Sequence, residues 1–257
     1  MKKNFDLSYE VKKLLLNNKY YVKYNRKKSP SKYERNYHYK VIDPDGKTRI
    51  LPNERKFKLK QLKYILSFLK KRKPCKILDI GCGHGWLLSS LNHKWNKYGV
   101  EISKFASINA SKYCKIFNGS FDSFKEKNFN IITALHIIEH HPNPEKFLKN
   151  IYSKLKPNGI LILETPDFDS AAARRFGNKF RLLKDKTHIS LFSADSLIRI
   201  VRKLKFKVFD INFPYFETPY FTKKNLLRIL DKSKVSPPFY GSTITLFLKK
   251  LNQKIIL

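Results

Sequence analysis

A strand, a tight turn and a helix follow one another in the stretch Lys76-Ile77-Leu78-Asp79-Ile80-Gly81-Cys82-Gly83-His84-Gly85-Trp86-Leu87-Leu88. Its first part is an apolar run typical of a buried strand, and three alternating glycines end that run. Leucines then resume at helical spacing. Such a turn presents free backbone N–H groups and the positive end of a helix to a ligand, which glycine allows to approach closely. The stretch therefore predicts a ligand-binding turn.

The spacing of the glycines excludes two common nucleotide-binding motifs. The dinucleotide fingerprint G-x-G-x-x-G would need a glycine at position 86, which is Trp86, and no Gly-Lys-Ser/Thr of a phosphate loop follows. A second acidic residue, Glu101, ends the next apolar strand, 22 positions after Asp79. A carboxylate at the tip of that strand is placed to accept the hydroxyls of a ribose, while Asp79 can order the glycine turn.

At these residues the chain resembles the class I S-adenosylmethionine-dependent methyltransferases. Their first motif is similar to D-x-G-x-G-x-G, which residues 79–85 match at each fixed position. Later segments of the form E-H-x-P-x-P, K-P-x-G and T-P resemble the small-molecule branch around quinone-type O-methyltransferases, and the similarity covers residues 75–212. The alternative is a structural turn in another α/β protein. The resemblance implies S-adenosylmethionine as cofactor, bound by Asp79, Gly81, Cys82, Gly83, Glu101, Ile102, Ser120, Phe121 and Leu135.

Strands and helices alternate from residue 75 onward, which predicts a parallel sheet covered on both faces. We expect an α/β fold with a doubly wound, Rossmann-like, seven-stranded methyltransferase sheet whose last strand is antiparallel. The predicted division is an N-terminal basic and aromatic extension over residues 1–53 and a methyltransferase domain over 54–257. Two insertions are expected in that domain, a substrate lid at 166–192 and a second loop at 214–240.

The extension itself is expected to contain a short helix over residues 9–16 and a hairpin whose strands are 39–42 and 48–51. A stripe of apolar residues over 62–69 then predicts a helix that enters the main domain. Between these elements, residues 20–39 interleave tyrosines with lysines and arginines. That mixture can stack nucleobases, line a substrate pocket or pack the extension against the domain.

The formal net charge of +34 attracts polyanions such as nucleic acid or anionic lipid headgroups. Half of it, +17, lies in the first 73 residues. However, 43 of the 54 basic residues are Lys and only 11 are Arg, the better residue for bidentate phosphate contacts. We therefore favour a compositional origin of the charge over a nucleic-acid-binding function, and we leave peripheral association with an anionic membrane open.

The compartment is expected to be cytoplasmic. No apolar run approaches the roughly 20 residues of a membrane-spanning helix, and the first residues lack the apolar region of a signal peptide. The three cysteines, Cys75, Cys82 and Cys114, form no C-x-x-C pair. Neither a disulfide framework nor a zinc site is therefore predicted.

Methyl transfer to a hydroxyl needs a base close to the acceptor. In the family that the chain resembles, the end of the fourth strand lies near the methyl group, and here Glu139 and His140 follow it. His188, between the lid and the next helix, is a second candidate base. We expect His140 or His188 as catalytic base and Glu139 as its orienting partner. Three lid arginines are candidates either for clamping an anionic substrate or for facing solvent: Arg174, Arg175 and Arg181.

The quinone-type relatives suggest a metal as an alternative. A pattern similar to E-x-x-E-H holds a divalent ion there, and this chain has His136-x-x-Glu139-His140. Imidazole in place of a carboxylate disfavours Mg²⁺, which prefers oxygen ligands. We expect no metal, although the sequence leaves the question open.

The predicted function is transfer of a methyl group from S-adenosylmethionine to a hydroxyl of a small molecule or glycan intermediate. The glycan is suggested only by the frequent occurrence of similar methyltransferases in polysaccharide biosynthesis. Two alternatives remain: an RNA methyltransferase that uses the basic extension, and a non-catalytic nucleic-acid-binding protein on a methyltransferase fold. The sequence does not predict the oligomeric state.

Overall fold

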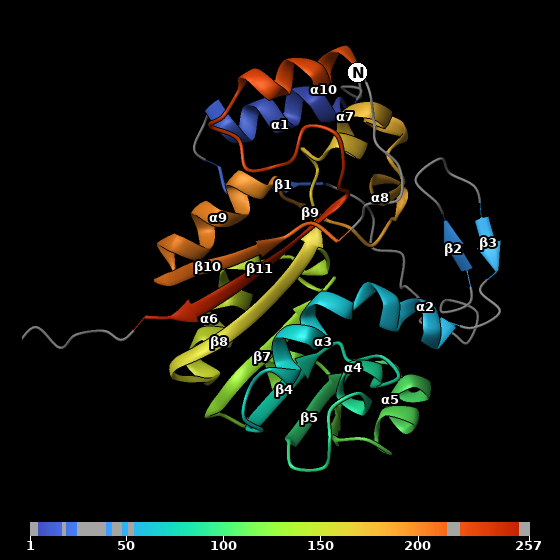
Figure 1. The fold of residues 1–257 in the computed structure, drawn as a ribbon, viewed down its shortest axis with the longest axis vertical. Coiled ribbons are helices and arrows are strands. Elements are labelled where there is room, and N and C mark those ends of the chain that lie inside the picture. Colours follow the sequence, from blue (N-terminus) through green and yellow to red (C-terminus); the bar gives the residue numbers. More distant parts are fainter. Residues whose placement is uncertain are drawn as a thin grey trace, which may run out of the picture.

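A computed structural model describes residues 5–16, 19–24, 40–42, 48–50, 54–214 and 222–251. A seven-stranded sheet forms its centre (Figure 1). The strands are β4 (Lys76–Ile80), β5 (Asn96–Glu101), β6 (Lys115–Asn118), β7 (Phe129–Leu135), β8 (Leu155–Pro166), β10 (Phe206–Asn212) and β11 (Thr243–Lys250).

The strands lie in the order β10-β11-β8-β7-β4-β5-β6. Neighbours from β8 through β6 are parallel, whereas β11 is antiparallel to both β8 and β10. The chain crosses from one half of the sheet to the other after β6, so the carboxyl ends of β4 and β7 meet at the centre. The predicted doubly wound sheet with an antiparallel last strand is confirmed.

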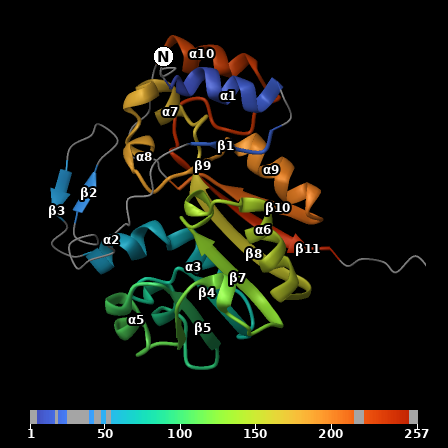
Figure 2. The ribbon, with the colours of Figure 1, turned by 180° about the vertical axis from the view of Figure 1, so that it is seen from behind.

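Helices cover both faces of the sheet (Figures 1 and 2). Successive residues of β4 point to opposite sides, because side chains alternate along a strand. Leu78 and Ile80 enter a core with α6 and α9, and Ile77 enters a second core with α3 and α4. The bounds of the helices on the two faces are α3 (Lys63–Lys70), α4 (Trp86–Ser89), α5 (Lys104–Ala110), α6 (Pro144–Lys154) and α9 (Ala194–Lys203).

Helix starts follow the capping chemistry of the sequence. Asn143 accepts a hydrogen bond from Lys146 N at the start of α6, and Ser193 forms a capping box with Ser196 at the start of α9. Two local features differ from the sequence pattern. The helix that the apolar stripe at 62–69 predicts starts after a break at Leu62, which separates α2 (Glu54–Gln61) from α3. Residues 157–159, Pro-Asn-Gly, are of types that favour a turn, but they lie within β8, beside a register shift against β7.

The N-terminal segment packs on the lid. Leu7 and Val11 of α1 (Leu7–Leu16) share a core with Phe168, Phe180 and Leu191, and strand β1 pairs antiparallel with β9. A separate hairpin joins β2 to β3, as expected. Its turn and residues 25–39 of the aromatic and basic stretch lie outside the described residues. The remaining bounds are β1 (Val22–Lys23), β2 (Lys40–Ile42), β3 (Thr48–Ile50), α7 (Ala171–Phe176), α8 (Arg181–Lys184) and β9 (Ser190–Leu191).

The second insertion returns to the lid through α10 (Lys223–Leu227) and the 3₁₀ turn η5 (Arg228–Leu230). The guanidinium of Arg174 in α7 donates to Asn225 Oδ1 over 2.6 Å and to the carbonyl oxygen of Pro237 over 2.9 Å. Arg174 therefore ties the two insertions together. Further 3₁₀ turns are η2 (Phe121–Ser123), η3 (Ile138–His140) and η4 (Gly177–Lys179). Within the described residues, no helix has the length and apolarity to cross a membrane.

Candidate functional site

The turn after β4 is built from glycines in the left-handed region of backbone space. Gly81 has φ 68° and Gly83 has φ 53°, which most side chains disfavour. The backbone N–H of Gly81 donates to Val100 O over 2.7 Å, which fixes the turn to β5. A Cβ on Gly81 would lie 2.1 Å from Ile137 Cδ1, whereas a Cβ on Gly83 would meet no atom within 4 Å. The backbone at Gly83 is therefore open to a ligand.

Glu101, at the end of β5, faces this turn. Its Oε2 accepts the backbone N–H of Gly83 over 2.9 Å, and its Oε1 accepts that of Ser103 over 2.8 Å. The side chain is largely buried, with 8% of the residue exposed. A carboxylate offers about four acceptor positions, and the backbone occupies two of them. Glu101 therefore keeps capacity for the two hydroxyls of a ribose.

Asp79 lies beneath the turn and has a different partner from the one expected. Its Oδ1 accepts a 2.6 Å hydrogen bond from Thr133 Oγ1 on β7, rather than ordering the glycine turn directly. Burial, together with the nearby charge of Glu101, raises the pKa of Asp79 to about 7, although the hydrogen bond from Thr133 opposes this shift. Asp79 thus titrates near neutral pH at the centre of the sheet.

These residues line a cavity of about 400 Å³ at the carboxyl ends of the strands. That volume lies in the usual range for small-molecule sites, and the open backbone and the acceptor capacity of Glu101 fit a nucleoside. All nine residues that the sequence suggested for the cofactor line this one cavity: Asp79, Gly81, Cys82, Gly83, Glu101, Ile102, Ser120, Phe121 and Leu135.

Other lining residues escaped the sequence analysis. Asp122, an acidic residue two positions after Ser120, also lines the cavity. Lys58 and Gln61 come from α2, which the sequence marks only as part of a helix. The ring of Phe121, which also lines the cavity, packs edge-on against the ring of Phe147 in the core.

His136 lines the cavity and lies between two carboxylates. Its backbone has φ 57°, its Nδ1 lies 3.3 Å from Glu139 Oε1, and its Nε2 lies 3.0 Å from Glu164 Oε1. Burial would lower the pKa of His136, but its contacts with the two glutamate carboxylates outweigh it and raise the pKa to about 9. His136 is therefore a cation at neutral pH.

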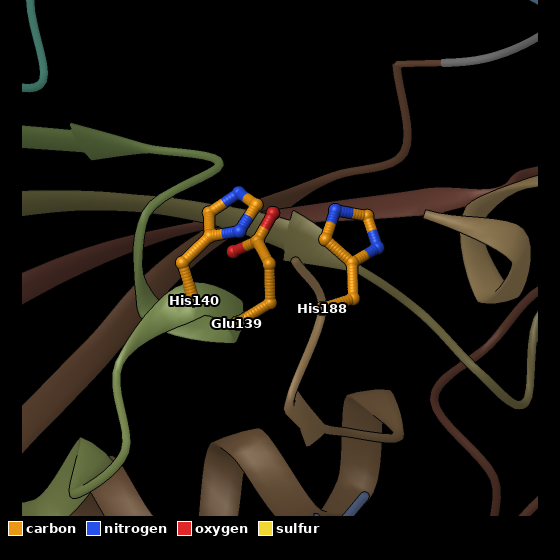
Figure 3. Close-up of side chains that lie close together, drawn as sticks. All are labelled: Glu139, His140 and His188. Atoms are coloured by element: carbon orange, nitrogen blue, oxygen red, sulfur yellow. The ribbon is translucent and has the colours of Figure 1, made fainter. Parts of the chain in front are cut away.

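Figure 3 shows the side chains of Glu139, His140 and His188 close together. These are the three residues that the sequence suggested as catalytic candidates. The ring centroids of the two histidines are 4.9 Å apart. Burial would raise the pKa of Glu139, but His136 and the nearby histidines lower it to about 2. Burial lowers the pKa of His188 to about 4. At neutral pH this cluster holds an ionised carboxylate and a neutral His188.

Backbone carbonyls orient both imidazoles. Nδ1 of His140 lies 3.1 Å from Thr187 O, and Nδ1 of His188 lies 2.5 Å from Leu182 O. A carbonyl only accepts, so each Nδ1 carries a proton and each neutral ring keeps a basic Nε2. Only His140 of the three lines the cavity. The geometry therefore separates an accessible base, His140, from two buried neighbours.

The same three residues offer ligand atoms that lie within 4.8 Å of one another, close enough to surround a metal ion. Two imidazoles and one carboxylate suit a transition metal better than Mg²⁺. The sequence pattern suggested His136, Glu139 and His140 as ligands. In the structure His188 takes the place of His136 in this group, and His136 contacts Glu139 and Glu164.

Comparisons with known proteins agree with this geometry. A family profile described as "Methyltransferase domain" matches residues 49–211. The ubiquinone biosynthesis O-methyltransferase of Schizosaccharomyces pombe is 33% identical over 102 residues, which cover 35% of this chain and 37% of that protein. The Pelagibacter ubique enzyme of the same name is 30% identical over 139 residues, covering 48% of this chain and 58% of the relative. The chain thus spans less than two thirds of each relative.

Solved structures share the fold. An S-adenosylmethionine-dependent methyltransferase from Archaeoglobus fulgidus has a TM-score of 0.55 at 19% identity, covering 76% of this chain and 94% of that one. The plantazolicin methyltransferase BpumL, in complex with a monoazolic desmethylPZN analog and SAH, has a TM-score of 0.53 at 17% identity, covering 78% of this chain and 85% of that one. The expected family and its cofactor, S-adenosylmethionine, agree with these matches. The chain belongs to the methyltransferase-domain family.

Proposed function

We propose that this protein is an S-adenosylmethionine-dependent O-methyltransferase that acts on a hydroxyl of a small molecule or glycan intermediate, with His140 as the general base. One observation carries the proposal. The glycine turn, Glu101 and His140 line a single cavity, so groups suited to bind a nucleoside and a group able to accept a proton share one space. The free thiols of Cys75, Cys82 and Cys114 accord with a cytoplasmic enzyme.

The cofactor would be held by the backbone around Gly83 and by the carboxylate of Glu101. When bound, S-adenosylmethionine supplies an electrophilic methyl group on a sulfonium. His136, which is a cation, holds the chain directly after β7 by its contacts with Glu139 and Glu164. That arrangement fixes η3, whose last residue is His140.

His140 takes the proton of the acceptor hydroxyl at Nε2. Its Nδ1–H is occupied by Thr187 O, so the ring is held in the tautomer that leaves Nε2 basic. The buried carboxylate of Glu139 favours the imidazolium that results, because the two groups attract when both are charged. His188 is a positioning residue in this account, since it is buried beside His140 and does not line the cavity.

Similarity to ubiquinone biosynthesis O-methyltransferases supports a hydroxyl acceptor. The RNA alternative receives less support. Tyr20 and Tyr21 of the aromatic and basic stretch pack against the main core, and the Tyr21 ring lies 5.7 Å from that of Phe192. Rings held in this way are less available for stacking on bases.

The experiment is transfer of a labelled methyl group from S-adenosylmethionine to a panel of phenols, sugars and an RNA pool. We expect label in a hydroxylated small molecule or sugar. His140→Gln should lower kcat by about 100-fold or more, with unchanged affinity for S-adenosylhomocysteine. His188→Gln should shift the pH profile of kcat with a smaller loss. Label in RNA alone, or full activity of His140→Gln, would contradict the proposal.

A further inference from the structure

The segment formed by α10 and η5 shows its apolar side chains to solvent. Leu226 is 58% exposed, Leu227 57%, Ile229 49% and Leu230 81%. Four adjacent large aliphatic side chains on a surface mark an interaction site more often than chance exposure does.

The exposure is built into the fold, because the polar side chains of the same segment face inward. Asn225 is fully buried, and its Oδ1 accepts a 2.6 Å hydrogen bond from Arg174 Nε. Arg228 pairs with Asp169 through a 2.5 Å contact between Nη2 and Oδ2. Thr222 caps the helix by accepting from Asn225 N. These bonds fix the rotation of the segment, so the leucines cannot turn inward without breaking a buried ion pair.

Basic residues frame this apolar patch, which consists of Leu226, Leu227, Ile229 and Leu230. Lys223 and Lys224 precede it and Lys232 follows it, and all three are exposed. Asp231 is the only acidic residue between positions 222 and 251, and its Oδ1 accepts hydrogen bonds from Ser233. The local charge is therefore positive, like that of the whole chain at +34.

Apolar side chains framed by lysines are complementary to a membrane surface that carries anionic headgroups. The aliphatic groups enter the boundary between headgroups and acyl chains, and the lysines contact phosphates. A second copy fits less well, since apposed patches would bring their lysines together in a chain that is already strongly cationic. Nucleic acid fits less well too, because it offers no apolar surface to aliphatic side chains.

We propose that the apolar patch and its lysines bind the protein peripherally to anionic lipid bilayers. Helix α1 lies beside α10 at the same end of the molecule in both views and adds Tyr9, which is 61% exposed, to that end (Figures 1 and 2). Tyrosine is favoured at membrane interfaces. The proposal does not depend on the identity of the methyl acceptor.

The test is co-sedimentation of the full chain with vesicles of phosphatidylcholine, with and without phosphatidylglycerol. We expect binding to the mixed vesicles that weakens with added salt. L226D/L230D should weaken it at least about tenfold, and K223E/K224E should weaken it severalfold. The matched controls lie on α5 and directly after it, at the opposite end of the molecule in both views: I108D, at a side chain that is 58% exposed, and K104E/K112E. Both should change binding little.

Circular dichroism and thermal unfolding establish that L226D/L230D is folded, which we expect because both side chains are exposed. Equal binding of L226D/L230D and the I108D control to mixed vesicles would overturn the proposal. It would show that the vesicles attract the protein through its general positive charge. Equal binding of the wild type to neutral and mixed vesicles would overturn the anionic requirement. If the wild type is a dimer in gel filtration and L226D/L230D is a monomer, the membrane proposal is overturned and the patch is an interface between copies.

Discussion

The Oε2 atom of Glu101 accepts the backbone N–H of Gly83 over 2.9 Å and so joins the end of β5 to the turn after β4. Two neighbouring parallel strands thereby present one acidic side chain and one open stretch of backbone to the same cavity. The carboxyl edge of an open α/β sheet is where ligands bind. This contact is the structural basis for the assignment of a nucleoside site.

Gly81 and Gly83 should respond differently to alanine, although both have positive φ. In Gly81→Ala the new Cβ would displace the end of the Ile137 side chain, so a rotamer change at Ile137 adds to the backbone strain, and we expect a loss of about 2–3 kcal/mol in the free energy of unfolding. In Gly83→Ala only strain of about 1–2 kcal/mol is expected. Gly83→Ala should instead weaken binding of S-adenosylhomocysteine. Urea unfolding and calorimetry measure the two effects, and equal stability losses would contradict the packing argument.

Asp79 predicts a pH dependence of stability. Its pKa rises from 3.8 to about 7 on folding, so the folded state binds more protons than the unfolded state between these values. Stability from this group is therefore lost as the pH rises from about 4 to 7, by up to about 4 kcal/mol at about 1.4 kcal/mol per pKa unit. The difference in unfolding free energy between wild type and Asp79→Asn should fall over this range. A constant difference would contradict the raised pKa.

His136 predicts a second loss of stability with rising pH, in a higher pH window. Its folded pKa of about 9 lies above the ordinary value of 6.5, so its stabilising contribution is complete below pH 6.5 and is lost as the pH rises through 9. In the variant His136→Asn, asparagine tolerates the positive φ of position 136 but carries no charge. The urea midpoint of the wild type should drop between pH 6.5 and 9.5 more than that of His136→Asn. Parallel profiles would show that the two glutamates do not hold a charged His136.

Arg174 and Arg175 are adjacent in sequence but have different roles in the structure. Arg174 is held by Asp169, Asn225 and Pro237, whereas Arg175 is exposed. Arg174→Ala should lower the free energy of unfolding by about 3–5 kcal/mol, because it leaves Asp169 without one of its partners. Arg175→Ala should change it by less than about 0.5 kcal/mol. Similar losses of unfolding free energy in the two variants would contradict the role of Arg174 in joining the two insertions.

The sequence predicted the parts of the structure that depend on local pattern. The glycines of the turn and the acidic end of the second strand each act within a few residues. Together with the resemblance to a family, they were sufficient for the sheet and for nine of the residues that line the cavity.

The missed features depend on partners that are distant in sequence. Nothing near Leu7 indicates that it packs on Phe168, and nothing near Arg174 indicates that its partners are Asn225 and Pro237. His136 was considered only within a local metal pattern, whereas its second carboxylate, Glu164, comes from another strand. Contacts across the fold decide these roles.

The most direct measurement is calorimetric titration of S-adenosylhomocysteine into the wild type and Glu101→Gln, with Glu126→Gln as a control at an exposed carboxylate paired with Lys76. The account predicts binding to the wild type and to Glu126→Gln. Glu101→Gln should bind about 10–100-fold more weakly, since hydrogen bonds to a charged group contribute about 1.5–3 kcal/mol. Thermal unfolding should show that all three proteins are folded. No binding to the wild type, or equal affinity in Glu101→Gln, would contradict the cofactor site.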